Sequence, residues 1–242
     1  MKTSRILPVL ALAAMMVSCV KPDSKEIHFS VLGDSFSAYE GTVDPETNDV
    51  YPYDQAGLTG PEQMWFSQVS NSTGWVIERN NSFSGALICN FDDYNSGSYF
   101  APYSYLRRMD NLGHPDVIFV FGGTNDIYRH TPLGDYVYDN WTTEQLCAFR
   151  PGLAYLFDGL KRQYPLAELY CLIDMELCIN DSTVDDETRQ AFIESMHRVA
   201  EHYQVKCIDI YGIKKTLWHP DVEGQEIIAS QVIEALEIDF NI

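Results

Sequence analysis

Four short blocks of the sequence carry side chains that could catalyse acyl transfer. Residues 33–36 (GDSF) hold a serine whose hydroxyl could act as a nucleophile. Residues 81–85 (NSFSG) and 122–126 (GGTND) supply a glycine N–H and an asparagine amide, two donors that could hold a developing oxyanion. Residues 219–221 (HPD) supply a histidine that could serve as general base. These residue types are common in turns, so no single block identifies a site.

The elements around the blocks predict how they would be brought together. Short runs of apolar or β-branched residues predict five strands, at residues 27–32, 75–79, 117–121, 168–173 and 205–210. Segments with helical spacing separate them, such as 186–203, where four large side chains share one helix face. Strands that alternate with helices favour one α/β domain with a parallel sheet covered on both faces. Ligands bind outside the carboxyl ends of such strands, where the first three blocks begin.

The order of these blocks resembles that of the SGNH (GDSL-like) hydrolase family, from Glu26 to the C-terminus. The resemblance implies a three-layer α/β/α sandwich of the flavodoxin-like type, with a five-stranded parallel sheet in the order 2-1-3-4-5. By position in the family's motifs, Ser35 would be the nucleophile and His219 the general base. Gly85 and Asn125 would form the oxyanion hole together with the main-chain N–H of Ser35.

One position departs from the family's pattern. The last block is usually Asp-x-x-His, but the residue three before His219 is Thr216. An acid there would fix the imidazole tautomer and stabilise the imidazolium. A main-chain carbonyl or the Thr216 hydroxyl could orient the ring instead, which would leave a Ser–His dyad. A carboxylate from Asp221 or Glu223 could also substitute, or the site could be weakened so that the protein chiefly binds its ligand.

The N-terminus has the features of an export signal. Residues 1–18 combine a basic start with an apolar run that is too short to span a bilayer. A small residue directly precedes Cys19, which resembles the bacterial lipobox, where the cysteine is lipidated and becomes the mature N-terminus. We expect a signal peptide at 1–18, a tether at 19–25 and the hydrolase domain at 26–242. The lipid would anchor the exported protein at the periplasmic or cell-surface face of the outer membrane, whereas an ordinary secretory signal would leave it free.

Composition limits the partners and cofactors. The 242 residues include 16 Lys and Arg against 35 Asp and Glu, which gives a formal net charge of −19. Such a surface repels nucleic acids and disfavours polyanionic substrates. Histidines and cysteines show no metal-ligand spacing, so we expect no metal and no cofactor.

Two long loops indicate the class of substrate. Residues 37–60 and 126–141 are polar and rich in tyrosine, and each follows a predicted strand. Tyrosine and tryptophan stack on sugar faces while their polar ends form hydrogen bonds. We therefore predict a serine ester hydrolase that removes acetyl or other short acyl groups from carbohydrate or a small ester. The alternative function is a surface glycan-binding lipoprotein that kept the fold and lost the catalytic rate.

Overall fold

The computed structural model describes residues 26–91 and 103–240. The expected signal peptide, the tether and Cys19 lie outside these ranges. Among the described residues, no helix combines the length and hydropathy that crossing a bilayer requires.

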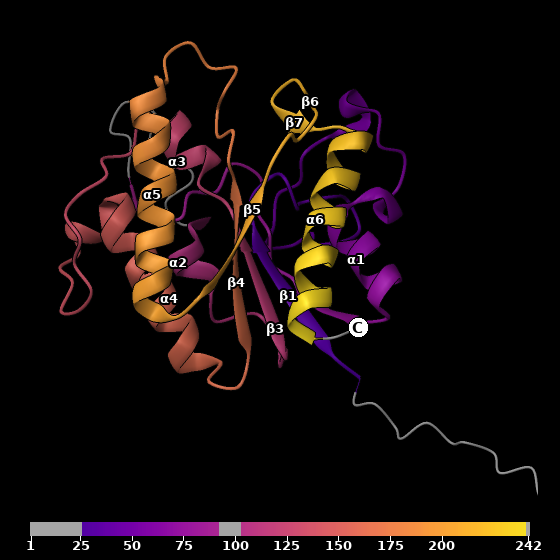
Figure 1. Ribbon diagram of the computed structural model, residues 1–242, viewed down its shortest axis with the longest axis horizontal. Coiled ribbons are helices and arrows are strands. Elements are labelled where there is room, and N and C mark those ends of the chain that lie inside the picture. Colours follow the sequence, from indigo (N-terminus) through magenta and orange to yellow (C-terminus); the bar gives the residue numbers. More distant parts are fainter. Residues whose placement is uncertain (1–25, 92–102, 241–242) are drawn as a thin grey trace, which may run out of the picture.

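Five parallel strands form the central sheet, in the order β2-β1-β3-β4-β5 (Figure 1). They are β1 (His28–Gly33), β2 (Val76–Asn80), β3 (Val117–Phe121), β4 (Glu168–Asp174) and β5 (Lys206–Ile210). This order and the helices on both faces confirm the expected three-layer α/β/α sandwich. Every residue of β3 is buried, which explains why this central strand is an unbroken apolar run.

Helices cover both faces of the sheet. The helices are α1 (Trp65–Thr73), α2 (Tyr105–Arg108), α3 (Thr124–Tyr128), α4 (Phe149–Gln163), α5 (Asp186–Tyr203) and α6 (Val222–Phe240), and short 3-10 turns occupy Tyr53–Ala56, Pro61–Gln63 and Gln145–Cys147. Helices α1 and α6 cover one face, and α4 and α5 cover the other (Figure 1). Alternate β3 side chains enter the two cores: Phe119 packs on Trp65 with ring centroids 5.7 Å apart, whereas Val120 faces the α4 and α5 core.

Helix α4 contains a proline and a glycine close to its start. It continues through both Pro151 and Gly152. Pro151 lies in the first turn, where a helix needs no N–H donor, so its missing N–H costs little. Gly152 allows close packing, because an added Cβ would lie 2.5 Å from the Cβ of Cys89.

A small hairpin precedes α6 and is strained. Its strands are β6 (Lys215–Thr216) and β7 (His219–Pro220), and Leu217 and Trp218 form the two-residue loop. Both loop residues have positive φ, at 47° and 76°. Tight hairpins use this conformation, but usually with Asn and Gly, because other side chains are strained by about 1–3 kcal/mol each. The hairpin lies at the edge of the sheet opposite the start of β1 (Figure 1).

Candidate active site

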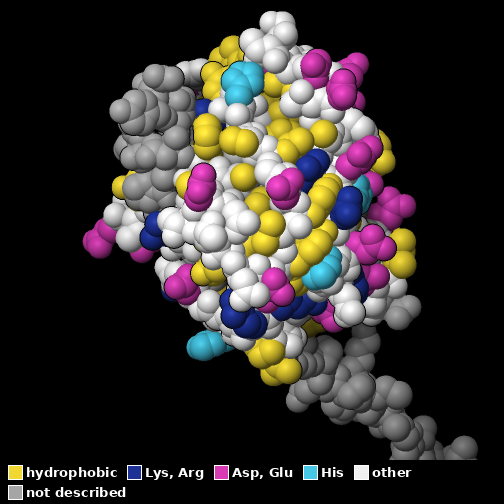
Figure 2. Space-filling view, turned by 90° about the vertical axis from the view of Figure 1, so that its left-hand side faces the viewer, with side chains coloured by type: hydrophobic (Ala, Val, Ile, Leu, Met, Phe, Trp, Pro, Cys, Tyr) yellow, Lys and Arg dark blue, Asp and Glu magenta, His cyan; other side chains and the backbone are white. Residues whose placement is uncertain are grey.

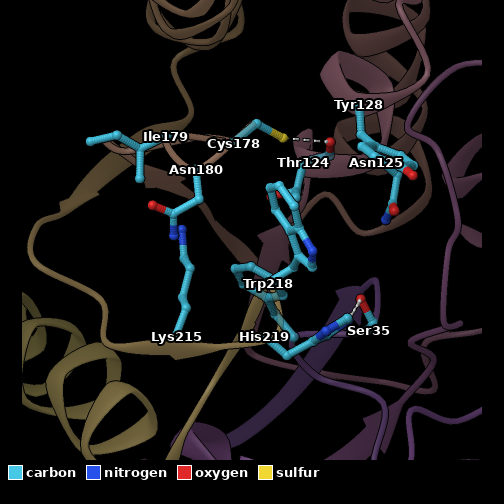
Figure 3. A pocket seen from close by; sticks show the side chains of 11 residues that line it. Ser35, Thr124, Asn125, Tyr128, Cys178, Ile179, Asn180, Lys215, Trp218 and His219 are labelled. Carbon is cyan, nitrogen blue, oxygen red and sulfur yellow. Dashed lines mark hydrogen bonds between the residues drawn. The ribbon is translucent and has the colours of Figure 1, made fainter. Parts of the chain in front are cut away.

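Ser35 and His219 form a close pair at the carboxyl edge of the sheet. Ser35 lies in the turn after β1, is 5% exposed, and its Oγ is 3.0 Å from Nε2 of His219 (Figure 3). The turn is fixed by the Asp34 carboxylate, which accepts the Phe36 N–H at 2.9 Å, and by the Tyr53 hydroxyl, which donates to the Ser35 carbonyl at 2.7 Å. The Oγ–Nε2 distance suits direct proton transfer.

The main chain orients the imidazole. Nδ1 of His219 lies 3.1 Å from the carbonyl oxygen of Leu217. A carbonyl can only accept a hydrogen bond, so Nδ1 carries the proton in this arrangement. Nε2 is then left as the acceptor for the Ser35 hydroxyl, which is the tautomer that a general base requires.

None of the described hydrogen bonds joins the three side chains considered for this role to the imidazole. Thr216 is exposed and faces His219 across the hairpin as its Cα partner. Asp221 accepts the Gly224 N–H at 2.9 Å, so its carboxylate caps the start of α6. Glu223 is exposed in the first turn of α6.

Tyr51 fixes the plane of the imidazole, a role that no sequence pattern indicates. Its ring is stacked on His219 with centroids 3.3 Å apart and planes 14° apart. Tyr53 packs edge-on against Tyr51 at 4.9 Å and is itself buried. These two tyrosines of the 37–60 loop, expected to contact sugar, instead pack around His219.

His219 is held in its neutral form. The pKa of His219 is lowered below 6.5, mainly by burial. The nearby Lys215 ammonium lowers this pKa further, whereas the hydrogen bond to the Leu217 carbonyl raises it. Lys215 is fixed by a buried ion pair, with its Nζ 2.6 Å from Asp174 Oδ2. A neutral imidazole at pH 7 can accept a proton from serine.

Asn125 and Gly85 belong to neighbouring turns. The Asn125 Nδ2 group donates to Asp34 Oδ2 at 3.2 Å and to the Ala86 carbonyl at 3.1 Å. Gly85 directly precedes Ala86, whose N–H donates to the Phe83 carbonyl and so closes a tight turn. The φ of Gly85 in this turn is 79°, a conformation that favours glycine. An oxyanion at Asn125 would have to share or replace these two long hydrogen bonds.

Most of these residues share one cavity of about 250 Å³. It is bounded by the turn after β1, by α3, by the loop after β4 and by the β6–β7 hairpin (Figure 3). Its lining residues are Ser35, Phe36, Thr124, Asn125, Tyr128, Cys178, Ile179, Asn180, Lys215, Trp218 and His219. Gly85 is not among them.

Cys178 places a thiol, a second candidate nucleophile, in this cavity. Its thiol donates to the Thr124 carbonyl at 3.4 Å, and burial raises the pKa of Cys178 to about 12. The thiol therefore stays protonated at neutral pH and is a poor nucleophile. Ser35, with a base 3.0 Å away, is the better one.

Two buried charged residues that sequence reasoning missed hold the turns in place. Asp126, the last residue of the GGTND block, accepts N–H bonds from Ile88 at 2.9 Å and Cys89 at 3.4 Å. Arg108 donates to the Gly33 carbonyl at 3.1 Å and also to a carbonyl of the turn after β2. The position of Asp126 in the GGTND block could have indicated a structural role, whereas no sequence pattern around Arg108 indicates one.

Within the described ranges, no three His, Cys, Asp or Glu side chains are placed to hold a metal ion.

Beyond Tyr128, which lines the cavity, aromatic rings of the second loop pack away from it. Tyr136 lies between two guanidinium groups, Arg150 at 4.3 Å and Arg198 at 3.9 Å from its ring centroid. Tyr138 stacks on His202 at 3.8 Å. Acidic, basic and apolar side chains are interspersed on this side of the molecule (Figure 2). These aromatic rings are anchored on helices and do not line the catalytic cavity.

Comparison with known proteins identifies the family. The model of the GDSL-like lipase/acylhydrolase family matches residues 27–236. A crystal structure from Bacteroides ovatus, described as a GDSL-like lipase, is 36% identical with a TM-score of 0.79, covering 89% of this chain and 100% of its own. A second from Bacteroides uniformis is 33% identical with a TM-score of 0.77, covering 88% and 96%.

More distant similarity is limited to the fold. A family two carbohydrate esterase from Clostridium thermocellum, solved with cellohexaose, is 14% identical with a TM-score of 0.58, covering 90% of this chain and 66% of its own. No protein of curated function matches the sequence. With the family's model matched over nearly all of the described chain, this protein belongs to the GDSL-like lipase/acylhydrolase family.

Proposed function

We propose that the protein is a serine ester hydrolase that uses a Ser35–His219 dyad. The observation that carries this proposal is the 3.0 Å contact between Ser35 Oγ and His219 Nε2, with Nδ1 occupied by the Leu217 carbonyl. As Oγ attacks the ester carbonyl carbon, Nε2 takes its proton. The imidazolium then protonates the leaving alcohol, and an acyl-serine remains. Water, deprotonated by His219, attacks this acyl group and releases the acid and free Ser35.

The developing negative charge needs donors during both steps. We assign these to the main-chain N–H groups of Ser35 and Gly85 and to Asn125 Nδ2. Asn125 lines the cavity beside Ser35, which supports its part in this set. Each such donor is typically worth about 3 kcal/mol in the transition state.

The proposed substrate is carbohydrate that carries acetyl or other short acyl groups. A cavity of about 150 Å³ can hold benzene, so about 250 Å³ leaves room for a short acyl group and little for a long chain. Tyr128 and Trp218, at the cavity's rim, are 52% and 47% exposed and offer faces to a sugar ring.

Hydrolysis of p-nitrophenyl esters tests the proposal. We expect the acetate ester to be cleaved faster than the decanoate ester, and a fluorophosphonate to label Ser35, as mapped by mass spectrometry. A label on another serine with Ser35 unmodified would contradict the assignment of Ser35 as the nucleophile.

Two features favour one other function, a glycan-binding lipoprotein with lost activity. The usual acid is absent at Thr216, and the Asn125 amide is already hydrogen-bonded. That function predicts binding of unacylated oligosaccharides with no ester cleavage.

Tyr51 gives a separate prediction about the base. Tyr51→Ala should lower kcat about 10- to 100-fold, because the imidazole plane loses the ring stacked on it. Water would also reach the ring. Since burial is the main cause of the lowered pKa of His219, that pKa should rise toward 6.5 and the acid limb of the kcat/KM profile should move to higher pH.

The conservative variant is the control. Tyr51→Phe keeps the stacked ring and should keep both the rate and the acid limb. The sign follows from the base being active only when neutral, so activity is lost as pH falls through its pKa. An acid limb that stays in place in Tyr51→Ala would contradict the role given to the stack.

We also propose that residues 1–18 are removed, that 19–25 form the tether of the 26–242 domain, and that Cys19 carries a lipid. The basic start, the short apolar run and the small residue before Cys19 support this. The protein would be exported and anchored at the outer membrane. Cys19→Ala should move it from the membrane fraction to the soluble fraction, as followed by fractionation and immunoblotting. A wild-type protein that is already soluble would contradict lipidation.

A further inference from the structure

A second hollow adjoins the catalytic cavity. This outer groove has a volume of about 540 Å³ and shares three wall residues with the cavity, Tyr128, Asn180 and Trp218. Its remaining wall is polar and includes Arg129 and Asp181. A molecule bound at Ser35 could therefore extend past the two aromatic side chains into the groove.

The two hollows differ in chemistry. The inner cavity presents apolar surface from Phe36 and Ile179, and its one ammonium, on Lys215, is paired with Asp174. The groove presents a carboxylate, a guanidinium, an amide and hydroxyl groups. An ester has an acyl part and an alcohol part on opposite sides of the reacting carbon. A short apolar acyl group suits the inner cavity, and an alcohol with many hydroxyls suits the groove.

The groove wall formed by the loop after β4 is held in place. Arg189 is buried and donates to the carbonyls of Leu177 at 2.7 Å and Val184 at 3.4 Å. Asp181 Oδ1 accepts the Thr183 N–H at 2.8 Å and the Thr183 hydroxyl at 2.7 Å, and these bonds lower the pKa of Asp181, which stays ionised at neutral pH. A wall ordered before binding lowers the entropic cost of holding a polar ligand.

We propose that the outer groove is the subsite for the alcohol part of the ester and that it takes a neutral sugar ring. The ring packs against Tyr128 or Trp218, and its hydroxyls bond to Asn180 and Asp181. The net charge of −19 disfavours sugars that carry carboxylates or sulfates. This inference rests on the proposed esterase function.

The test compares two acetyl esters with different alcohols. One is p-nitrophenyl acetate, and the other is a panel of partially acetylated cello-, xylo- and manno-oligosaccharides, assayed by released acetate. The readout is the ratio of kcat/KM for the best oligosaccharide to kcat/KM for p-nitrophenyl acetate. Tyr128→Ala and Asp181→Ala should each lower this ratio about tenfold.

Two further variants keep the result interpretable. Tyr211→Ala removes an equally exposed tyrosine (57%) that lines neither hollow, and it should leave the ratio unchanged. Asp181→Asn keeps an acceptor for Thr183 but loses the charge, and the ratio should fall about threefold even if the alanine variant disturbs the loop.

The outcomes separate the two proposals. Cleavage of p-nitrophenyl acetate with no oligosaccharide cleaved, or an unchanged ratio in both Tyr128→Ala and Asp181→Asn, overturns the sugar subsite and leaves the esterase standing. No cleavage of any ester overturns the proposed function itself.

Discussion

Ser35→Ala should lower kcat for p-nitrophenyl acetate by about 10⁵- to 10⁶-fold, the usual scale for losing the nucleophile of a serine hydrolase. The Cys178 thiol could not replace it, because burial keeps that thiol protonated. Removing the Ser35 hydroxyl loses its hydrogen bond to Nε2 of His219, so the melting temperature should fall by no more than a few degrees. Steady-state kinetics and a thermal melt on the same sample measure both effects.

Ser37→Ala is the matched control. Ser37 is two residues away and fully buried, and its Oγ accepts the Trp65 indole N–H at 3.0 Å. Its loss should cost about 1–2 kcal/mol of unfolding free energy, with kcat retained. If Ser35→Ala kept more than a few per cent of the wild-type rate, another group would have to be the nucleophile.

Asn125→Ala should lower kcat by about 10²- to 10³-fold with little change in KM, because an oxyanion donor acts mainly in the transition state. The Nδ2 group donates to Asp34 and to the Ala86 carbonyl in the resting site, so the oxyanion would have to share or replace one of these bonds. Both effects can be measured with p-nitrophenyl acetate.

Asn71→Ala, an exposed asparagine of α1, serves as a control for general effects of the substitution. It should match the wild type in kcat and melting temperature. A markedly lower melting temperature in Asn125→Ala with normal kcat would show instead that Asn125 is structural, joining α3 to Asp34 and to the turn after β2.

Elements with strong local signals could be predicted from the sequence. Helix α5 begins and ends where the spacing predicts, since Asp185 caps it by accepting the Thr188 N–H at 2.7 Å. Each strand lies within one residue of its predicted ends, because the runs are rich in apolar or β-branched side chains. The positions of Ser35 and Asn125 followed from the ends of these strands.

The surroundings of His219 could not be predicted, because they depend on contacts without a local pattern. Tyr51 reaches the imidazole from a loop far away in the sequence. The carbonyl that orients Nδ1 points correctly only because Leu217 and Trp218 adopt positive φ, which neither residue type favours. Similarly, the richness in tyrosine was visible, but composition does not say whether a ring such as Tyr136 packs on arginines or faces a ligand.

The direction of β1 decides what an anchored enzyme could reach. The strand begins at His28, at the amino ends of the parallel strands, and finishes just before Ser35, at their carboxyl ends. The β6–β7 hairpin lies at this carboxyl end of the sheet (Figure 1). With a lipid on Cys19, as we propose, the tether at 19–25 spans at most about 25 Å and joins the domain at the edge remote from the cavity. The bilayer would then face the amino edge of the sheet, and the cavity would open toward the surroundings. Phospholipids of the same membrane would be out of reach, whereas soluble or extracellular polymers could approach the nucleophile freely.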